Sequence, residues 1–118
     1  MATTYALIIE DDELVAGLLE TFLEDIGFTS IDIAPTPSVA VASAQEKRPD
    51  LIVADADLLH GSGIDAVEEI CRDKTSPVVF ISLTPAQVFK RMPKAFVAPK
   101  PLVETVFVER VRRALGSH

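Results

Sequence analysis

Residues 5–27 read YALIIEDDELVAGLLETFLEDIG, and this stretch contains one complete β–α unit. Its first five residues are largely apolar, as in a strand that is buried on both faces of a sheet. Four acids follow at positions 10–13. Apolar residues then recur at the three- and four-residue spacing of a helix, and Gly27 stands where helices commonly end. The residues that recur at this spacing are Leu14, Leu18, Leu19, Phe22, Leu23 and Ile26.

The same alternation of strand and helix continues along the chain. Further short β-branched runs occupy residues 28–34, 51–54, 77–82 and 95–98. Helical patterns lie at about 36–47, where Thr36 and Pro37 form the start, at 64–72, from Thr84 and Pro85 onward, and at 102–115. Five successive β–α units predict an α/β fold, a five-stranded parallel sheet with helices on both faces. In such sheets the functional crevice lies beyond the carboxyl ends of the strands.

The composition argues against several classes of protein. The chain has 118 residues, enough for one domain, residues 1–118, with a single core. Its formal net charge of −7 argues against a nucleic-acid partner, because phosphate contacts need clustered Lys and Arg. No apolar stretch is long enough to span a bilayer, and the first residues lack the pattern of a signal peptide. We therefore expect a cytoplasmic protein without a membrane partner.

Cysteine and histidine are too scarce for several common kinds of site. Cys71 is the only cysteine, which excludes an internal disulfide and a zinc site built from cysteines. On an apolar helical face it is expected to be a small core residue. The two histidines, His60 and His118, are a poor basis for a metal site or a Ser-His-Asp triad.

Polar residues that carry chemistry stand at the ends of four of the expected strands. Glu10 and Asp11 follow the first, Asp55 the third, Ser82 ends the fourth, and Lys100 follows the fifth. Carboxylates that meet at one edge of a sheet raise one another's pKa, and a hard divalent cation such as Mg²⁺ resolves the conflict. A carboxylate can also attack phosphorus, and a lysine and a hydroxyl can bind the phosphoryl oxygens.

These motifs, in this order, resemble the receiver domains of two-component response regulators over essentially the whole chain. They are LIIEDDE after the first strand, PDLIVAD with GSGIDAVEEI downstream, SPVVFIS, and PKP after the fifth strand. The resemblance implies the CheY-like variant of the flavodoxin-like fold, a doubly wound sheet with strand order 2-1-3-4-5. It implies a signalling switch rather than an enzyme with a separate substrate. Asp55 would accept a phosphoryl group from a histidine kinase or a histidine phosphotransfer protein, and Ser82 and Lys100 would bind its oxygens.

The resemblance also implies a set of metal ligands. Asp11 and Asp55 would ligate Mg²⁺ directly, Glu10 would act through the water shell of the metal, and the backbone carbonyl of Asp57 would complete the protein ligands. In the family the position of Asp57 and that of Thr84 influence how long the phosphoryl group lasts.

The four consecutive acids leave two possible metal-binding pairs. In the family the acid pair follows the apolar strand directly, which selects Glu10 and Asp11. Asp12 would then cap the first helix, and Glu13 would lie in its first turn, where the helix dipole favours acids. The alternative pair, Asp11 and Asp12, stays open.

Three features depart from the family pattern. Leu59 stands where receivers usually carry a proline, and only 17 residues separate Ser82 from Lys100, which predicts a shortened region around the fourth helix. Val97 occupies the position of the usual switch Tyr or Phe, while Phe96 is expected to face the other side of the sheet. The usual coupling, in which an aromatic ring follows the inward movement of Ser82, cannot operate in that form.

The leading interpretation is a stand-alone phosphoacceptor switch, a monomer or a weak homodimer, whose phosphorylation changes a surface that a protein partner recognises. The alternative is a pseudo-receiver that binds its partners constitutively without phosphorylation. A flavodoxin-like module for an anion such as FMN is disfavoured, because no early turn carries a Gly- or Ser/Thr-rich phosphate loop.

Overall fold

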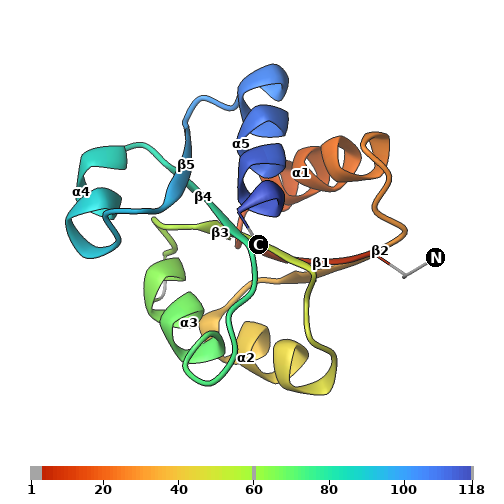
Figure 1. Cartoon of the computed structure of the whole chain (residues 1–118), viewed down its shortest axis with the longest axis vertical. Helices are drawn as coiled ribbons and strands as arrows, with labels where there is room; N and C mark the ends of the chain where they lie inside the picture. The colour runs from red at the N-terminus through yellow and green to blue at the C-terminus, as the bar shows by residue number, and fades with distance from the viewer. Residues whose placement is uncertain (1–3, 60, 118) are drawn as a thin grey trace.

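The computed structural model describes residues 4–59 and 61–117 and arranges them in three layers around a parallel sheet (Figure 1). The strands are β1 (Tyr5–Ile9), β2 (Ser30–Ala34), β3 (Leu51–Asp55), β4 (Val78–Ser82) and β5 (Phe96–Pro99). The helices are α1 (Glu13–Asp25), α2 (Pro37–Glu46), α3 (Gly63–Ile70), α4 (Pro85–Arg91) and α5 (Glu104–Gly116). The strand order β2-β1-β3-β4-β5 confirms the expected fold class. Residues 1–3, His60 and His118 lie outside the described part of the chain.

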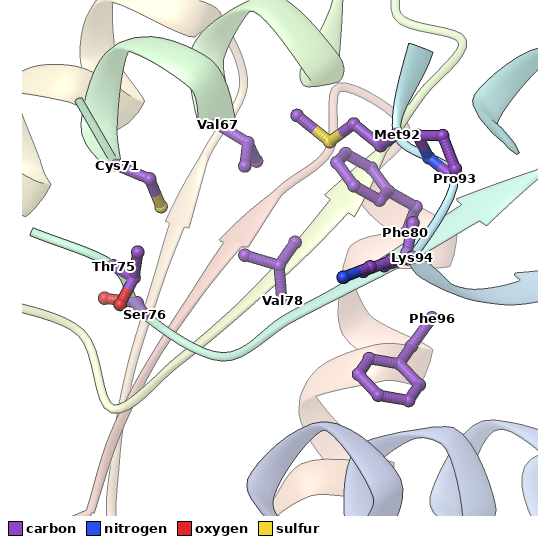
Figure 2. A pocket seen from close by; sticks show the side chains of 11 residues that line it. Val67, Cys71, Thr75, Ser76, Val78, Phe80, Met92, Pro93, Lys94 and Phe96 are labelled. Carbon is purple, nitrogen blue, oxygen red and sulfur yellow. The ribbon is translucent and has the colours of Figure 1, made fainter. Parts of the chain in front are cut away.

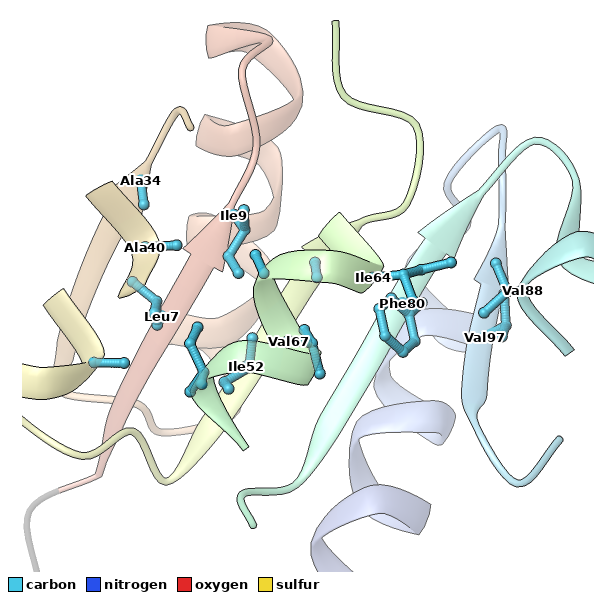
Figure 3. Close-up of a cluster of buried hydrophobic side chains, with 14 of the residues drawn as sticks. Leu7, Ile9, Ala34, Ala40, Ile52, Ile64, Val67, Phe80, Val88 and Val97 are labelled. Atoms are coloured by element: carbon cyan, nitrogen blue, oxygen red, sulfur yellow. The ribbon is translucent and has the colours of Figure 1, made fainter. Parts of the chain in front are cut away.

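Strands β1, β3, β4 and β5 send alternate side chains into two separate cores. All five residues of β1 and of β3 are buried, because helices cover both faces of the sheet. On one face α1 and α5 pack together, with the rings of Phe22 and Phe107 6.0 Å apart. On the other face α2, α3 and α4 cover a core that contains Leu7, Ile52 and Phe80 (Figure 3). The short apolar runs in the sequence are thus strands that are buried on both sides.

The parallel register brings the carboxyl ends of neighbouring strands to one edge of the sheet. Ile9 pairs with Ala54, so the residue after β1 lies beside Asp55, the last residue of β3. Ser82 pairs with Pro99, so the residue after β5 lies beside the end of β4. This edge is where the candidate site residues were expected.

Helix α1 begins as predicted but buries a narrower stripe than its sequence indicates. The carboxylate of Asp12 accepts hydrogen bonds from the backbone N–H groups of Leu14 and Val15, at 2.9 and 3.3 Å, which makes Asp12 the N-cap. Leu14 is 86% exposed and Leu18 42% exposed, although both belong to the apolar spacing of this helix. Only one stripe of α1 faces the sheet and α5. The buried residues of α1 are Ala16, Leu19, Phe22 and Leu23.

The observed bounds differ from the expected ones by a few residues. Strand β2 begins at Ser30 rather than at residue 28, because the backbone N–H of Phe28 bonds back to the oxygen of Leu23 in α1 at 3.1 Å. Helix α3 ends at Ile70 and α5 begins at Glu104. Helix α4 has only seven residues, as the short interval before Lys100 predicted.

The chain returns from α4 to β5 across an apolar pocket of about 540 Å³ (Figure 2). Val67 of α3 and Cys71, which follows the helix, form one wall, and Phe80 and Met92 another. Cys71 is partly exposed rather than fully within the core. The pocket lies toward the amino ends of β4 and β5, away from the edge that carries Asp55. Among the described residues no helix is long and apolar enough to cross a membrane.

Candidate functional site

Three carboxylates converge at the carboxyl edge of the sheet. Glu10, Asp11 and Asp55 each offer one oxygen within 4.8 Å of the others. Glu10 follows β1 and Asp55 ends β3, so their proximity results from the pairing of these two strands. The carboxylate of Asp12 is engaged with the start of α1 instead. The structure therefore assembles the pair Glu10 and Asp11 with Asp55, and it does not assemble the alternative pair of Asp11 and Asp12.

Asp55 is nearly buried, and both of its carboxylate oxygens have partners. Its Oδ2 lies 2.8 Å from Nζ of Lys100, and its Oδ1 accepts a hydrogen bond from the backbone N–H of Asp57 at 2.8 Å. The side chain of Asp55 is 3% exposed and that of Lys100 is 20% exposed. Burial alone lowers the pKa of Lys100, but the hydrogen bond and the charge of Asp55 outweigh it and raise the pKa above its ordinary value. Lys100 is therefore a fixed positive charge beside Asp55.

Glu10 is a buried acid that lacks a full set of partners. Its Oε2 accepts a hydrogen bond from the backbone N–H of Asp12 at 3.1 Å, whereas its Oε1 is buried without a hydrogen-bond partner in residues 4–59 and 61–117. Burial, reinforced by the negative charge of Asp55, raises the pKa of Glu10 from 4.5 to about 8. A buried carboxyl oxygen without a partner costs stability. A hard cation, or water bound to one, satisfies such an oxygen, so this donor set fits Mg²⁺.

Asp11 connects two loops of the site. Its Oδ2 accepts a hydrogen bond from the backbone N–H of Leu59 at 2.7 Å, which ties the β3–α3 loop to the start of α1. The side chain of Leu59 is 85% exposed, so its contribution to the site is this N–H group. A proline at position 59 would lack the donor. Because residue 59 is leucine rather than the usual proline, its N–H can donate a hydrogen bond to Asp11, a candidate metal ligand.

The side chain of Asp57 makes contacts that the sequence did not reveal. Its Oδ2 accepts hydrogen bonds from Oγ of Ser82 at 3.3 Å and from the backbone N–H of Leu83 at 3.1 Å. Asp57 also lines a pocket of about 350 Å³ together with Asp55 and Lys100. The other residues that line this pocket are Glu10, Asp11, Asp12, Val15 and Leu59. Asp57 therefore belongs to the site through its carboxylate as well as through its position in the chain.

Gly63 is a residue of the site that sequence reasoning missed. A Cβ atom at this position would lie 2.0 Å from the backbone oxygen of Asp55, far inside van der Waals contact. The start of α3 can approach the end of β3 this closely only because residue 63 has no side chain. Ser62 caps the helix through a hydrogen bond from the N–H of Ile64 at 3.1 Å. The signal in the sequence was the GSG run at residues 61–63, directly before the helical pattern.

The position of the usual aromatic switch residue carries a small, buried side chain. Val97 is 5% exposed and belongs to the core beneath α3 and α4, where Val88 of α4 also packs (Figure 3). Phe96 packs against the core on the opposite face, as strand alternation predicted. Rotation of an aromatic ring at position 97 is thus not available to connect Ser82 to α4.

Comparison with known proteins agrees with this geometry. The family model described as "Response regulator receiver domain" matches residues 6–95. The regulator PhyR of Methylorubrum extorquens is 42% identical over 102 residues, which are 83% of this chain and 38% of that protein. The chain thus spans less than half the length of this relative.

Two solved structures of PhyR proteins superimpose closely on the chain. The receiver domain of Erythrobacter litoralis PhyR has a TM-score of 0.87 and 32% identity, and the match covers 98% of this chain and 92% of that one. The anti-anti-sigma factor PhyR from Bartonella quintana has a TM-score of 0.82 and 32% identity, and the match covers 99% of this chain and 49% of that one. The chain belongs to the response regulator receiver family.

Proposed function

We propose that this receiver domain is a phosphorylation switch in which Asp55 accepts a phosphoryl group from a phosphohistidine on a kinase or a phosphotransfer protein. The observation that carries the proposal is the buried Asp55 carboxylate, which lies between the ammonium group of Lys100 and the acids Glu10 and Asp11. A surface acid that served only solvation would need neither burial nor a lysine partner at 2.8 Å.

The reaction is a nucleophilic displacement at phosphorus. A carboxylate oxygen of Asp55 forms a bond to phosphorus while the bond from phosphorus to the histidine nitrogen breaks. The electron pair of that bond leaves with the imidazole, which takes a proton from solvent or from its own protein. Lys100 balances the charge of the transferred group, and the hydroxyl of Ser82 can donate to one of its oxygens.

We propose Mg²⁺ as the cofactor of this reaction. Asp11, Asp55 and the backbone carbonyl of Asp57 would hold it, and Glu10 would accept hydrogen bonds from water bound to it. The ion would offset the negative charge that accumulates as the phosphoryl group approaches three carboxylates. The buried, unpartnered Oε1 of Glu10 supports this assignment, because no protein group fills that place among the described residues.

Mass spectrometry after incubation with acetyl phosphate tests the proposal. With Mg²⁺ present, wild type should gain one phosphoryl group, and Asp55→Asn should gain none because the amide is not a nucleophile. Asp25→Asn, which changes an exposed acid of α1, is the matched control and should behave as wild type. The proposal is wrong if wild type gains no phosphoryl group or if Asp55→Asn gains as much.

Val97 supports a second candidate, a pseudo-receiver that binds its partners constitutively. Because no aromatic ring stands at this position, the best-known route from the site to the α4 surface is missing. In that case partner binding would be the same for wild type and Asp55→Asn, with and without acetyl phosphate. The acid cluster around Asp55 favours the phosphorylation switch.

We propose that the output is a contact with another protein in the cytoplasm rather than with DNA. The net charge of −7 disfavours DNA, and a similar protein, PhyR of Bartonella quintana, is an anti-anti-sigma factor. Because the chain spans only about half of that protein, its own partner needs direct identification. Proteins that are retained by the phosphorylated chain, and not by Asp55→Asn, would be the candidates.

A further inference from the structure

We propose that the Asp57 carboxylate is a positioning residue that holds the β4–α4 loop in the unphosphorylated protein and releases it when Asp55 is phosphorylated. The release of the loop, which is the second half of this inference, rests on the proposed function. The first half, the holding of the loop, concerns the unphosphorylated protein alone.

The contacts of Asp57 join two loops across the edge of the sheet. Asp57 lies in the β3–α3 loop, and its backbone N–H donates to Oδ1 of Asp55. Its Oδ2 accepts hydrogen bonds from the hydroxyl of Ser82 and from the N–H of Leu83, which lie 25 and 26 residues further along the chain. The side chain of Leu83 is 68% exposed. The loop is therefore anchored at this point by the backbone N–H of Leu83 rather than by burial of its side chain.

The hydroxyl of Ser82 has a single proton to donate. Ser82 is fully buried, and its Oγ already accepts a hydrogen bond from the backbone N–H of Thr84 at 2.9 Å. Asp57 is a charged acceptor for the proton at 3.3 Å, and Oγ1 of Thr84 lies 3.4 Å away. A phosphoryl oxygen on Asp55 would compete for the same proton. Ser82 cannot serve both Asp57 and the phosphoryl group.

Phosphorylation also adds negative charge beside Asp57. The carboxylate of Asp55 carries one charge, whereas its phosphorylated form carries about two near neutral pH. Asp57 is tied to Asp55 by the 2.8 Å hydrogen bond from its own N–H, so it cannot move far from the new charge without breaking that bond. Like charges at this distance repel. Asp57 thus loses the hydrogen bond that Ser82 donates to it, and it is repelled by the new charge. Both effects favour release of the N–H of Leu83.

The released segment leads directly into α4. Leu83 and Thr84 precede Pro85, the first residue of the helix, and the N–H of Gln87 bonds to the backbone oxygen of Thr84 at 3.0 Å. In the described part of the chain the side chain of Thr84 makes no capping hydrogen bond to α4. The Asp57 contact is thus a connection between the phosphorylation site and α4 that needs no aromatic residue at position 97.

Amide hydrogen exchange of Leu83, measured by NMR, tests both halves of the proposal. The variants are Asp57→Ala, which removes the acceptor, and Asp57→Asn, which keeps a neutral acceptor. Asp73→Ala changes an exposed acid elsewhere and is the control. Each protein is measured alone and with Mg²⁺ and acetyl phosphate. Total phosphorylation is followed by mass spectrometry in parallel.

In the unphosphorylated state the Leu83 amide should exchange about tenfold faster in Asp57→Ala than in wild type, since one hydrogen bond to a charged acceptor is lost. Phosphorylation should produce a similar acceleration in wild type and in Asp73→Ala. Asp57→Asn should stay slow in both states, because its amide keeps the acceptor but is not repelled. A purely structural role for Asp57 would not produce this dependence on phosphorylation.

Equal exchange of Leu83 in unphosphorylated wild type and Asp57→Ala would overturn the positioning role. If wild type accepts a phosphoryl group but the exchange of Leu83 does not change, the release is wrong while the proposed function stands. If wild type accepts no phosphoryl group, the proposed function and the release fall together. Faster exchange in unphosphorylated Asp57→Ala would then still support the holding of the loop.

Discussion

Replacement of Glu10 by Gln should stabilise the protein at high pH in the absence of divalent cations. In the folded state burial, reinforced by Asp55, raises the pKa of Glu10 from 4.5 to about 8. Between these two pH values the folded state holds a proton that the unfolded state has lost. The contribution of protonated Glu10 to the free energy of unfolding is therefore fully present at low pH, and it is lost as the pH rises towards 8. The amide of the Glu10→Gln variant would not titrate, and its carbonyl oxygen can still accept the hydrogen bond from the N–H of Asp12.

The expected difference in stability between wild type and Glu10→Gln follows from the difference between the folded and unfolded pKa values of Glu10. Each pH unit corresponds to about 1.4 kcal/mol, so a carboxyl that titrates near 4.5 when unfolded and near 8 when folded loses at most about 5 kcal/mol over that range. Water entering the pocket screens these charges and reduces this value. We expect Glu10→Gln to be more stable than wild type by about 2–4 kcal/mol at about pH 8.5, and nearly equal to it at about pH 5.

Urea denaturation of both proteins with EDTA, across this pH range, measures the difference. With Mg²⁺ present, wild type should instead be the more stable of the two at high pH, because the ion stabilises ionised Glu10 and binds the variant more weakly. The reasoning would be refuted if wild type without metal were as stable as Glu10→Gln at about pH 8.5, or if the gap between them did not change with pH.

Three further substitutions test single features of the site. Lys100→Ala should leave the buried Asp55 without its ion pair and cost about 2 kcal/mol in urea denaturation, while phosphorylation by acetyl phosphate slows but remains detectable. Gly63→Ala should cost more than about 2 kcal/mol and displace the end of β3, because the new Cβ would meet the backbone oxygen of Asp55. Its control Gly17→Ala, in a helix with open space around it, should stabilise by about 0.5–1 kcal/mol, and equal effects of the two changes would refute the close approach. Asp12→Ala should lower stability by about 1 kcal/mol through loss of the α1 N-cap, with an unchanged rate of phosphorylation, and a large loss of that rate would return Asp12 to the candidate metal ligands.

Most of the fold could be predicted from local patterns. The strand runs and helix starts were identified within a few residues, because short apolar runs, the 3.6-residue spacing of helices and the caps at Asp12 and Thr36 are local features of the sequence. The exposure of Leu14 and Leu18 could not be predicted in this way. How much of a helix is covered depends on where its neighbouring elements lie, and α1 has only the sheet and α5 beside it.

The residues of the site were also predicted from their places after the strands. What the sequence left open was which of the four consecutive acids face Asp55, since all four are chemically alike. The hydrogen bond from Leu59 to Asp11 joins residues 48 positions apart, and it was not foreseen. No local pattern reports a contact over such a distance.

The sequence by itself determined the order of strands and helices, the family, and the set of residues that reach the edge of the sheet, because each follows from short-range patterning and from the rule that parallel strands end together. Only the tertiary structure decided how those side chains divide their hydrogen bonds. The side chain of Asp12 caps α1, and that of Asp57 bonds to Ser82 and Leu83. Glu10 is buried with one oxygen that has no hydrogen-bond partner in the described part of the chain. The physical reason is that a side chain's partner is set by the groups that packing brings within about 3 Å, and those groups come from distant parts of the chain.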